Sequence, residues 1–409
     1  MEPAPRYSNT PSVFQLVLGI ISFVLVVIAT LALIVLSFAS QQLDQTTLQT
    51  VKYLTWIIAS LAIPAIFSTL YAIRGLFPKA GLQPPKSRLF LTVSLFLIGL
   101  LPLAWLTTLP AFEPAPAWFK ALASLLFVGV TAWWFVELGQ IRLPRLSRQR
   151  QWGLVNFANF VSMPVILLVE MVVLALGLGL LIAWLMKKPE YAFVINQVQN
   201  LMYVNLDTLP LIIDQLKPLA QDPAVIAAIL VAFSLVIPLI EELLKPLALW
   251  FFVKRQWSPA EGFVAGMLCG AAFAVVESLT ALASVGGDSW LALVAARAGT
   301  ALLHITTAGL SGWALTSSWR DGSYLRVGFT YLLVVFLHGA WNFFAVVVAA
   351  SSLIEGNSPI FFSGLAPVAP WLMGVLVAAF FATLMTMNYR LRQQEVSTIP
   401  PQLPPALPE

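Results

Sequence analysis

The sequence carries little charge for its length. Only 10% of its 409 residues are Asp, Glu, Lys or Arg, whereas soluble globular chains carry roughly 25%. Hydrophobic residues make up 59% of the chain. Eighteen acidic and 22 basic side chains are too few to solvate the surface of a soluble protein of this size. Soluble enzymes and disordered chains are therefore excluded.

Cysteine is also scarce. The single cysteine, Cys269, excludes an intramolecular disulfide and therefore a small disulfide-stabilised scaffold. The formal net charge of +4 is better explained by sorting of basic residues between loops than by a nucleic-acid-binding patch. We therefore expect a bilayer and no nucleic acid among the partners of this chain.

Long apolar runs fill most of the sequence. Crossing a bilayer core of about 30 Å takes about 20 apolar residues in a helix. The segments that qualify are Val13–Ala39, Tyr53–Ile73, Leu89–Thr108, Trp118–Leu138, Ser162–Met186, Ala224–Val253, Ala260–Ala283, Leu291–Ser317, Val327–Ser351 and Val368–Tyr389. The sequence predicts an all-α, polytopic membrane protein with about ten transmembrane helices.

Lysine and arginine are distributed unevenly between the loops. If the N-terminus is inside, fifteen of these residues lie on inner pieces, five on outer pieces and two within spans. This bias predicts that both termini are cytoplasmic. Ser37 and Ala39 in the first span have signal-peptide cleavage spacing. The apolar run is longer than the roughly 7–15 residues of a signal core, so we expect a permanent anchor.

The spans and loops suggest five regions. The loop from Lys187 to Pro223 reads either as interfacial amphipathic helices or as an ordinary packed loop. The prolines near the C-terminus are typical of an extended disordered end. The regions are 1–153, a four-helix membrane region of unknown role; 154–223, the fifth span with an outer loop; 224–351, a membrane core with polar motifs; 352–389, the last span; and 390–409, a Pro-rich disordered tail.

Ionisable residues accumulate within the spans from the fifth span onward. Each costs roughly 2.5–3.5 kcal/mol at the bilayer centre, so such residues indicate function by default. Both histidines of the chain lie in the middle of spans. At about 1.5 Å of rise per residue, Glu241, Glu277, His304 and His338 fall in one layer near the midplane. The polar set is Glu170, Glu241, Glu242, Lys245, Glu277, Arg297, His304, His338 and Asn342.

Spacing within each helix indicates which groups can meet. Glu241 and Lys245 are four residues apart and share a helix face, whereas Glu242 is turned by about 100° toward another neighbour. His338 and Asn342 also share a face, so the amide can orient the imidazole or act as a second donor. A surplus carboxyl in a low-dielectric region suits a general base or acid.

Two further features have alternative interpretations. Glu277 can take part in the polar layer or pair structurally with Arg297, which lies at a similar depth. Gly262, Gly266 and Gly270 form a stripe of small residues that lets helix backbones approach closely. Tight packing alone explains this stripe.

These residues resemble the motifs of the PrsW-type intramembrane proteases. Glu241-Glu242-Leu-Leu-Lys245 is similar to the E-E-x-x-K motif of that family, and Phe273-Ala-Val-Val-Glu277 to its F-x-x-x-E motif. His304 and His338-Gly-Ala-Trp-Asn342 are similar to its later histidine motifs. The wider superfamily includes the CAAX prenyl endopeptidases and bacteriocin-processing proteases. Glu277 and Lys245 favour the PrsW branch over the prenyl endopeptidases.

The resemblance implies an intramembrane endopeptidase that hydrolyses membrane-anchored protein substrates, such as an anti-sigma factor. We expect Glu241 to act as general base on a water, with Glu242 and Lys245 tuning its protonation. His304 helps to hold the water, and Glu277 shares the protons or fixes His304. His338 and Asn342 donate to the developing oxyanion.

The metal requirement stays open at this stage. The family has been described both as metalloproteases and as glutamic-type proteases, and zinc held by His304, His338 and Glu277 is an alternative. We favour a metal-free mechanism and assign no cofactor.

A proton-coupled secondary transporter with a midplane Glu/His/Lys cluster is the alternative function. A scaffold in which the polar cluster only joins helices is a third possibility. The expected location is a bacterial cell membrane.

Overall fold

The computed structural model describes residues 10–39, 45–77, 89–107, 115–189, 191, 196, 219–252, 257–284, 289–353 and 360–397. All regular secondary structure in these residues is helical, in agreement with the predicted fold class. The chain divides into two compact units, which are described separately. Unit 1 comprises Met1–Met163, Lys245–Gly328 and Phe380–Glu409, and unit 2 comprises Pro164–Leu244 and Phe329–Ala379.

The described helices confirm a multi-pass integral membrane protein. Nine helical stretches among the described residues are long and apolar enough to cross a membrane, and each coincides with a predicted span. The segment predicted at Leu89–Thr108 corresponds to a shorter apolar helix, Phe90–Trp105. It is interrupted at Leu100 between α4 (Leu89–Gly99) and α5 (Leu101–Thr107), because Pro102 has no N–H for the carbonyl four residues earlier.

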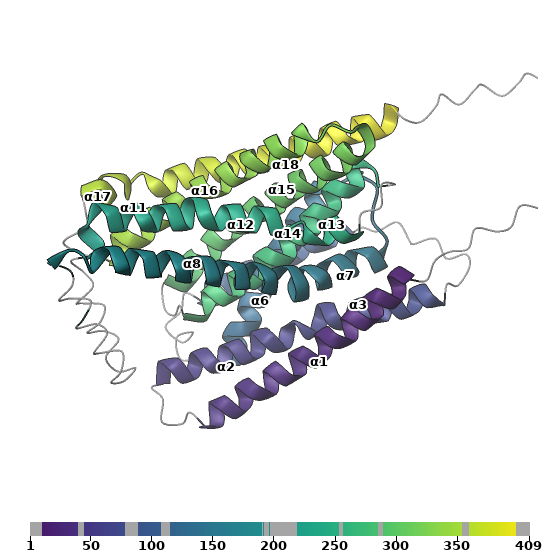
Figure 1. The fold of residues 1–409 in the computed structure, drawn as a ribbon. Coiled ribbons are helices and arrows are strands. Elements are labelled where there is room, and N and C mark those ends of the chain that lie inside the picture. Colours follow the sequence, from purple (N-terminus) through teal and green to yellow (C-terminus); the bar gives the residue numbers. More distant parts are fainter. Residues whose placement is uncertain are drawn as a thin grey trace, which may run out of the picture. The chain divides into compact units, whose positions relative to one another are not determined.

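Unit 1 is built around a helix pair, α14 and α15 (Figure 1). α1 packs on α2 and α3, and α6 packs on α2, α4, α14 and α15. α14 begins with a capping box, in which Ser258 and Glu261 bond each other's backbone N–H. The helices of unit 1 are α1 (Thr10–Ala39), α2 (Gln45–Ser60), α3 (Ala62–Leu76), α4, α5, α6 (Ala117–Gly139), α7 (Arg148–Phe157), η2 (Ala158–Ser162), α13 (Leu247–Phe252), α14 (Pro259–Ala281), η6 (Leu282–Ser284) and α15 (Ser289–Asp321).

The glycine stripe on α14 is the contact surface for α15. A side chain at Gly262 would collide with Thr316, one at Gly266 with the backbone of Ala308, and one at Gly270 with the backbone of His304. The sequence therefore identified a true close approach of two helix backbones. This approach also fixes the position of the His304 backbone against α14.

Unit 2 contains a broken helix that faces α16. The break is a π-helical turn, η5, between α11 and α12; such turns often occur at functional sites. α16 and α18 continue into unit 1 at Leu325–Gly328 and from Phe380 onward. The helices of unit 2 are α8 (Met163–Leu185), η4 (Leu219–Gln221), α11 (Pro223–Val231), η5 (Ala232–Val236), α12 (Ile237–Leu244), α16 (Leu325–Leu353), α17 (Ile360–Leu365) and α18 (Ala369–Ser397).

The C-terminal end of the last helix differs from the expectation, and two predicted segments lie largely outside the described residues. α18 extends to Ser397, so residues 390–397 are helical and the Pro-rich tail cannot start at 390. The reason is composition, because no proline or glycine occurs in this stretch before Pro400. Most of the loop between Lys187 and Pro223, and residues 398–409, lie outside the described residues.

Candidate active site

Unit 2 brings Glu242 and His338 into direct contact. The His338 Nδ1 lies 2.8 Å from the Glu242 Oε1, and both side chains are almost completely buried. Helical spacing turned Glu242 away from the face of Glu241 and toward another neighbour. That neighbour is His338, on α16. A carboxylate on one ring nitrogen fixes the orientation of the imidazole and leaves the other nitrogen, Nε2, for chemistry.

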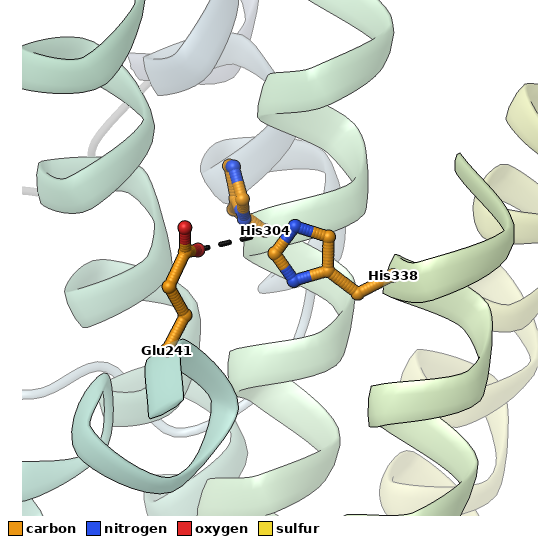
Figure 2. A group of neighbouring side chains, drawn as sticks. All are labelled: Glu241, His304 and His338. Atoms are coloured by element: carbon orange, nitrogen blue, oxygen red, sulfur yellow. Dashed lines mark ion pairs between the residues drawn. The ribbon is translucent and has the colours of Figure 1, made fainter. Parts of the chain in front are cut away.

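The other ring nitrogen of His338 faces Glu241. The His338 Nε2 lies 3.9 Å from the Glu241 Oε2, as the dashed line in Figure 2 marks. This separation exceeds the 2.7–3.2 Å of a direct hydrogen bond, and a polar separation beyond about 3.5 Å is commonly bridged by water. It is also close to the roughly 3.4 Å between two ligands of a tetrahedral zinc with bonds of 2.0–2.2 Å. The pair can therefore hold one water or one ion.

Three contacts hold α16 against η5 and α12 within unit 2. Gly339 lies against the backbone oxygen of Ser234, where a side chain would collide. The Asn342 amide donates to the Phe233 carbonyl at 3.0 Å, and the Tyr331 hydroxyl donates to the Leu239 carbonyl at 2.8 Å. Because His338 lies between Tyr331 and Asn342, these bonds hold its ring opposite the paired glutamates.

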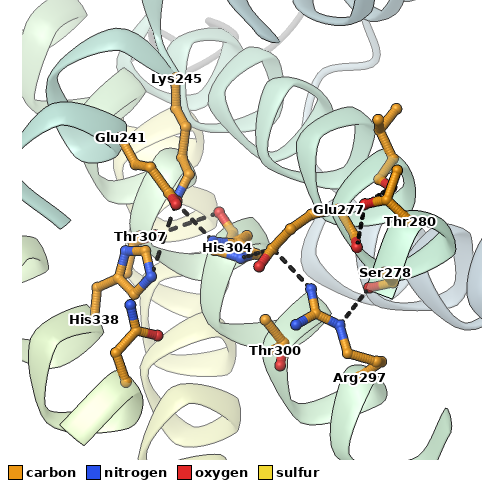
Figure 3. A network of polar contacts seen from close by, with 12 residues as sticks. Glu241, Lys245, Glu277, Ser278, Thr280, Arg297, Thr300, His304, Thr307 and His338 are labelled. Atoms are coloured by element: carbon orange, nitrogen blue, oxygen red, sulfur yellow. Dashed lines mark hydrogen bonds and ion pairs between the residues drawn. The ribbon is translucent and has the colours of Figure 1, made fainter. Parts of the chain in front are cut away.

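Unit 1 places His304 between two charged side chains. Its Nε2 lies 2.7 Å from the Glu277 Oε2, and its Nδ1 lies 2.7 Å from the Lys245 Nζ (Figure 3). His304 and Lys245 are buried. A neutral ring that accepts from a Lys245 ammonium at Nδ1 and donates to the Glu277 carboxylate at Nε2 would satisfy both contacts.

Arg297 contacts the same carboxylate oxygen of Glu277 as His304 does. Its Nη2 lies 2.7 Å from the same Glu277 Oε2, and its Nε donates to the Ser278 hydroxyl at 3.0 Å. This carboxylate therefore contacts Arg297 and His304 together. Its side chain is 33% exposed, against 0% for His304, so Glu277 is the more accessible of the two.

Phe273 has a role that the motif spacing did not predict. Its ring lies in edge contact with the His304 ring, with centroids 5.0 Å apart. The Lys245 Nζ lies 4.6 Å from the same ring centroid. The aromatic side chain therefore supports the Lys245 ammonium by a cation–π contact and limits rotation of His304. Only its place in the F-x-x-x-E motif could have drawn attention to it.

The chemistry of the donors fits a metal ion in part. Each histidine has a carboxylate on one ring nitrogen, which is the arrangement that orients metal-binding imidazoles in proteins. His338 fits this arrangement with Nε2 toward Glu241. At His304, an ion would have to replace either the Lys245 contact or the Glu277 contact. Glu277 itself is held by Arg297, which favours an orienting role over ligation.

Comparison with known families gives a match for this chain. The model of a family described as PrsW family intramembrane metalloprotease matches residues 168–380, just over half of the chain. The match covers every residue of the groups described above. Searches of curated proteins and of solved structures returned no match.

Proposed function

This chain belongs to the PrsW family of intramembrane metalloproteases, and from this membership we propose that it cleaves membrane-anchored proteins with Glu241 as general base. The observation that carries the proposal is the buried pair of Glu241 and Glu242 on the two nitrogens of His338. Burial of two carboxylates beside one imidazole is costly, and hydrolysis of a peptide bond gives this arrangement a use.

In the proposed reaction, a water lies between Glu241 and His338. Glu241 accepts a proton from this water as it attacks the carbonyl carbon, and returns the proton to the leaving amine. Glu242 holds the His338 Nδ1, so the ring can direct Nε2 toward the developing oxyanion. The Asn342 amide has two N–H groups. One N–H donates to the Phe233 carbonyl, and we propose that the second donates to the same oxyanion.

The groups from unit 1 complete the proposed site. Lys245 is only four residues from Glu241, a length of chain that spans about 14 Å at most. All three residues lie within the matched family region, and we assign Lys245 and His304 to the same reaction as Glu241. Lys245 supplies positive charge beside the buried carboxylates, and His304 helps to hold the water. Glu277 acts as a positioning residue, because it contacts His304 and Arg297.

The family description implies a metal ion, and Glu241, His304 and His338 each offer a ligand atom for one. Two imidazoles and one carboxylate are a protein ligand set for catalytic zinc, so Glu241 replaces Glu277 in the set that the sequence suggested. A bound zinc would activate a water as nucleophile. Glu242 and Glu277 would then orient the two ligating histidines. A carboxylate has two oxygens, so Glu241 can serve an ion with one and accept a proton with the other.

The orientation and the substrate are further parts of the proposal. The excess of lysine and arginine on the inner pieces supports cytoplasmic termini, and we assign the protein to a bacterial cell membrane. The substrate is a membrane-anchored protein, for example a regulator of the anti-sigma type, whose peptide bond enters the midplane layer.

Cleavage of a model transmembrane peptide by the purified protein in detergent tests this function. Glu241→Gln keeps the size of the side chain but removes the base, so we expect cleavage to fall by about 10² to 10⁴-fold. Glu170→Gln is the matched control, because Glu170 lies within the α8 span outside the proposed site, and its cleavage rate should stay near that of wild type. Equal cleavage by wild type and Glu241→Gln would reject the assignment. Gradient-driven uptake into proteoliposomes, without cleavage, would support a carrier.

Direct metal analysis separates the metal question from activity. If Glu241, His304 and His338 hold an ion, the wild type should retain about one equivalent of zinc after purification, and His338→Ala should retain much less. Equal zinc in both proteins would argue against this ligand set, while leaving the cleavage test above unaffected.

A further inference from the structure

A cavity in unit 1 lies where four candidate membrane spans begin or end. Its volume is about 390 Å³, and it is lined by Pro259, Trp313, Ser317, Arg320, Asp321, Arg326 and Gln394. Pro259 is the first residue of one span, Asp321 the last of another, and Arg326 and Gln394 lie one residue from the ends of two more. The cavity therefore belongs to one surface of the membrane, where lipid headgroups lie.

The two arginines of this cavity differ in their contacts. Arg326 donates to Asp321 at 2.7 Å, and its guanidinium lies 5.7 Å from the centroid of the Trp313 ring. Among the residues that the structure describes, Arg320 has no ion pair or hydrogen bond. One carboxylate against two guanidinium groups leaves one uncompensated positive charge in the cavity, which suits an anion.

The wall of the cavity also offers the hydroxyl of Ser317. Ser317 is only 6% exposed, and in the described part of the chain its side chain makes no hydrogen bond. Its hydroxyl can therefore bond a group that enters the cavity. Together with the guanidinium of Arg320, this hydroxyl provides two donors for the oxygens of a phosphate group.

Exposed apolar side chains lie beside the charged groups. Tyr324 is 62% exposed and Leu325 is 77% exposed, and both immediately precede Arg326 in the chain. A soluble anion has no apolar part that could pack on these side chains, whereas a phospholipid brings acyl chains next to its headgroup. Basic pockets between transmembrane helices commonly hold anionic lipid headgroups.

We propose that this cavity binds the phosphate headgroup of an anionic phospholipid. Arg320 and Ser317 contact the phosphate oxygens, Arg326 adds charge from the side of Asp321, and Tyr324 and Leu325 contact the first part of the acyl chains. The site is separate from the groups assigned to catalysis and does not depend on the proposed peptidase reaction.

Native mass spectrometry of the detergent-purified full chain tests this inference. Dioleoylphosphatidylglycerol and dioleoylphosphatidylcholine are offered at equal concentration, and we expect the wild type to retain the anionic lipid preferentially. Arg320→Gln should weaken this preference about fivefold, since one basic residue near the surface contributes about 1 kcal/mol to anionic lipid binding. Ser317→Ala removes only the hydroxyl and should weaken it in the same direction. The matched control is Arg390→Gln, which removes a cation from the α18 segment of unit 1 outside the cavity.

The outcomes distinguish the sources of the anion. Loss of the preference in Arg320→Gln and Ser317→Ala, with Arg390→Gln unchanged, supports the lipid site. Equal effects of Arg320→Gln and Arg390→Gln would overturn it, because the effect would then be that of general charge. Inorganic phosphate or a decaglutamate peptide that displaces phosphatidylglycerol at equal concentration would assign the cavity to a soluble anion or an acidic protein segment, and would also overturn it.

Discussion

At the scale of single residues, the polar groups of unit 1 form a chain in which each member restrains the next. Arg297 and His304 both contact the Glu277 Oε2, and Lys245 contacts the far side of the His304 ring. These contacts fix the orientation of the His304 ring, because the ring cannot turn without breaking its contact with Lys245 or with Glu277. Arg297 thereby acts on His304 through Glu277.

Replacing Arg297 tests this positioning role. In Arg297→Ala, Glu277 loses one of the two side chains described above that contact its carboxylate, and we expect kcat to fall about 10- to 100-fold, as for other residues that orient catalytic ligands. KM should stay nearly constant because Arg297 is not assigned a contact with substrate. Arg297→Lys should recover part of the loss, since the charge returns without the fork of donors.

Ser278→Ala is the control for Arg297. It removes only a neutral acceptor of the Arg297 Nε–H and should change kcat by less than threefold or so. Steady-state kinetics on the model transmembrane peptide measure all three variants. A parallel rise of KM in Arg297→Ala, or an equal loss in Ser278→Ala, would contradict the role given to Arg297.

At the scale of helices, the glycine contacts between α14 and α15 set the position of His304. A Cβ atom on Gly270 would collide with the His304 carbonyl. Backbone cannot move aside as a flexible side chain can, so the two helices have to separate. We expect Gly270→Ala to destabilise the protein by about 1–3 kcal/mol and to reduce cleavage at the same time.

Gly129→Ala provides the matched control for this prediction. Gly129 lies within α6 of the same unit, and the space around its missing Cβ is open. Alanine there should be neutral or stabilising by about 0.5–1 kcal/mol. Thermal unfolding in detergent compares the two variants, and an unchanged midpoint for Gly270→Ala would refute the packing argument.

The start of α11 gives a prediction about pH. The Asp222 carboxylate caps the helix by accepting from the N–H groups of Ala224 and Val225. The hydrogen bond from Lys188, with those from Tyr191 and the cap, lowers the pKa of Asp222 to about 2. Because the folded pKa lies below the unfolded value of about 3.9, the stabilisation is complete above pH 4 and is lost as the pH falls from about 4 to 2.

Asp222→Asn separates the charge from the cap. Asparagine caps helices as well as aspartate does but has no charge to pair with Lys188. Wild type should therefore have the higher thermal midpoint at pH 6, and the difference should shrink as the pH falls toward 3. A difference that is constant over this range would show that the charge of Asp222 does not contribute.

At the scale of the whole molecule, hydrophobicity determines what the sequence can predict. The spans follow from the length of apolar runs, and nine long helices among the described residues coincide with predicted ones. Burial of the paired glutamates and histidines also follows, because their segments have no other place than the membrane. Residue order along a helix, however, gives only the direction of a side chain and not its partner across helices.

The pairings illustrate this limit. Helical spacing places Lys245 on the same face as Glu241, but it gives no sign that Lys245 also contacts His304 on α15. The pairing of Glu242 with His338 joins residues 96 positions apart, and no local pattern specifies it. The apolar run Ala224–Val253 also predicts one continuous span, whereas α12 ends at Leu244. Pro246 has no backbone N–H with which to extend this helix.

The central proposal is that His304 and His338 both serve the hydrolytic reaction of this family. Cleavage of a transmembrane peptide in proteoliposomes by His304→Ala and by His338→Ala tests it most directly, because each unit contributes one of these histidines. Circular dichroism and thermal unfolding would verify that both variants fold. We predict that each variant loses at least about 100-fold of the wild-type rate. Wild-type cleavage by either folded variant would contradict the claim.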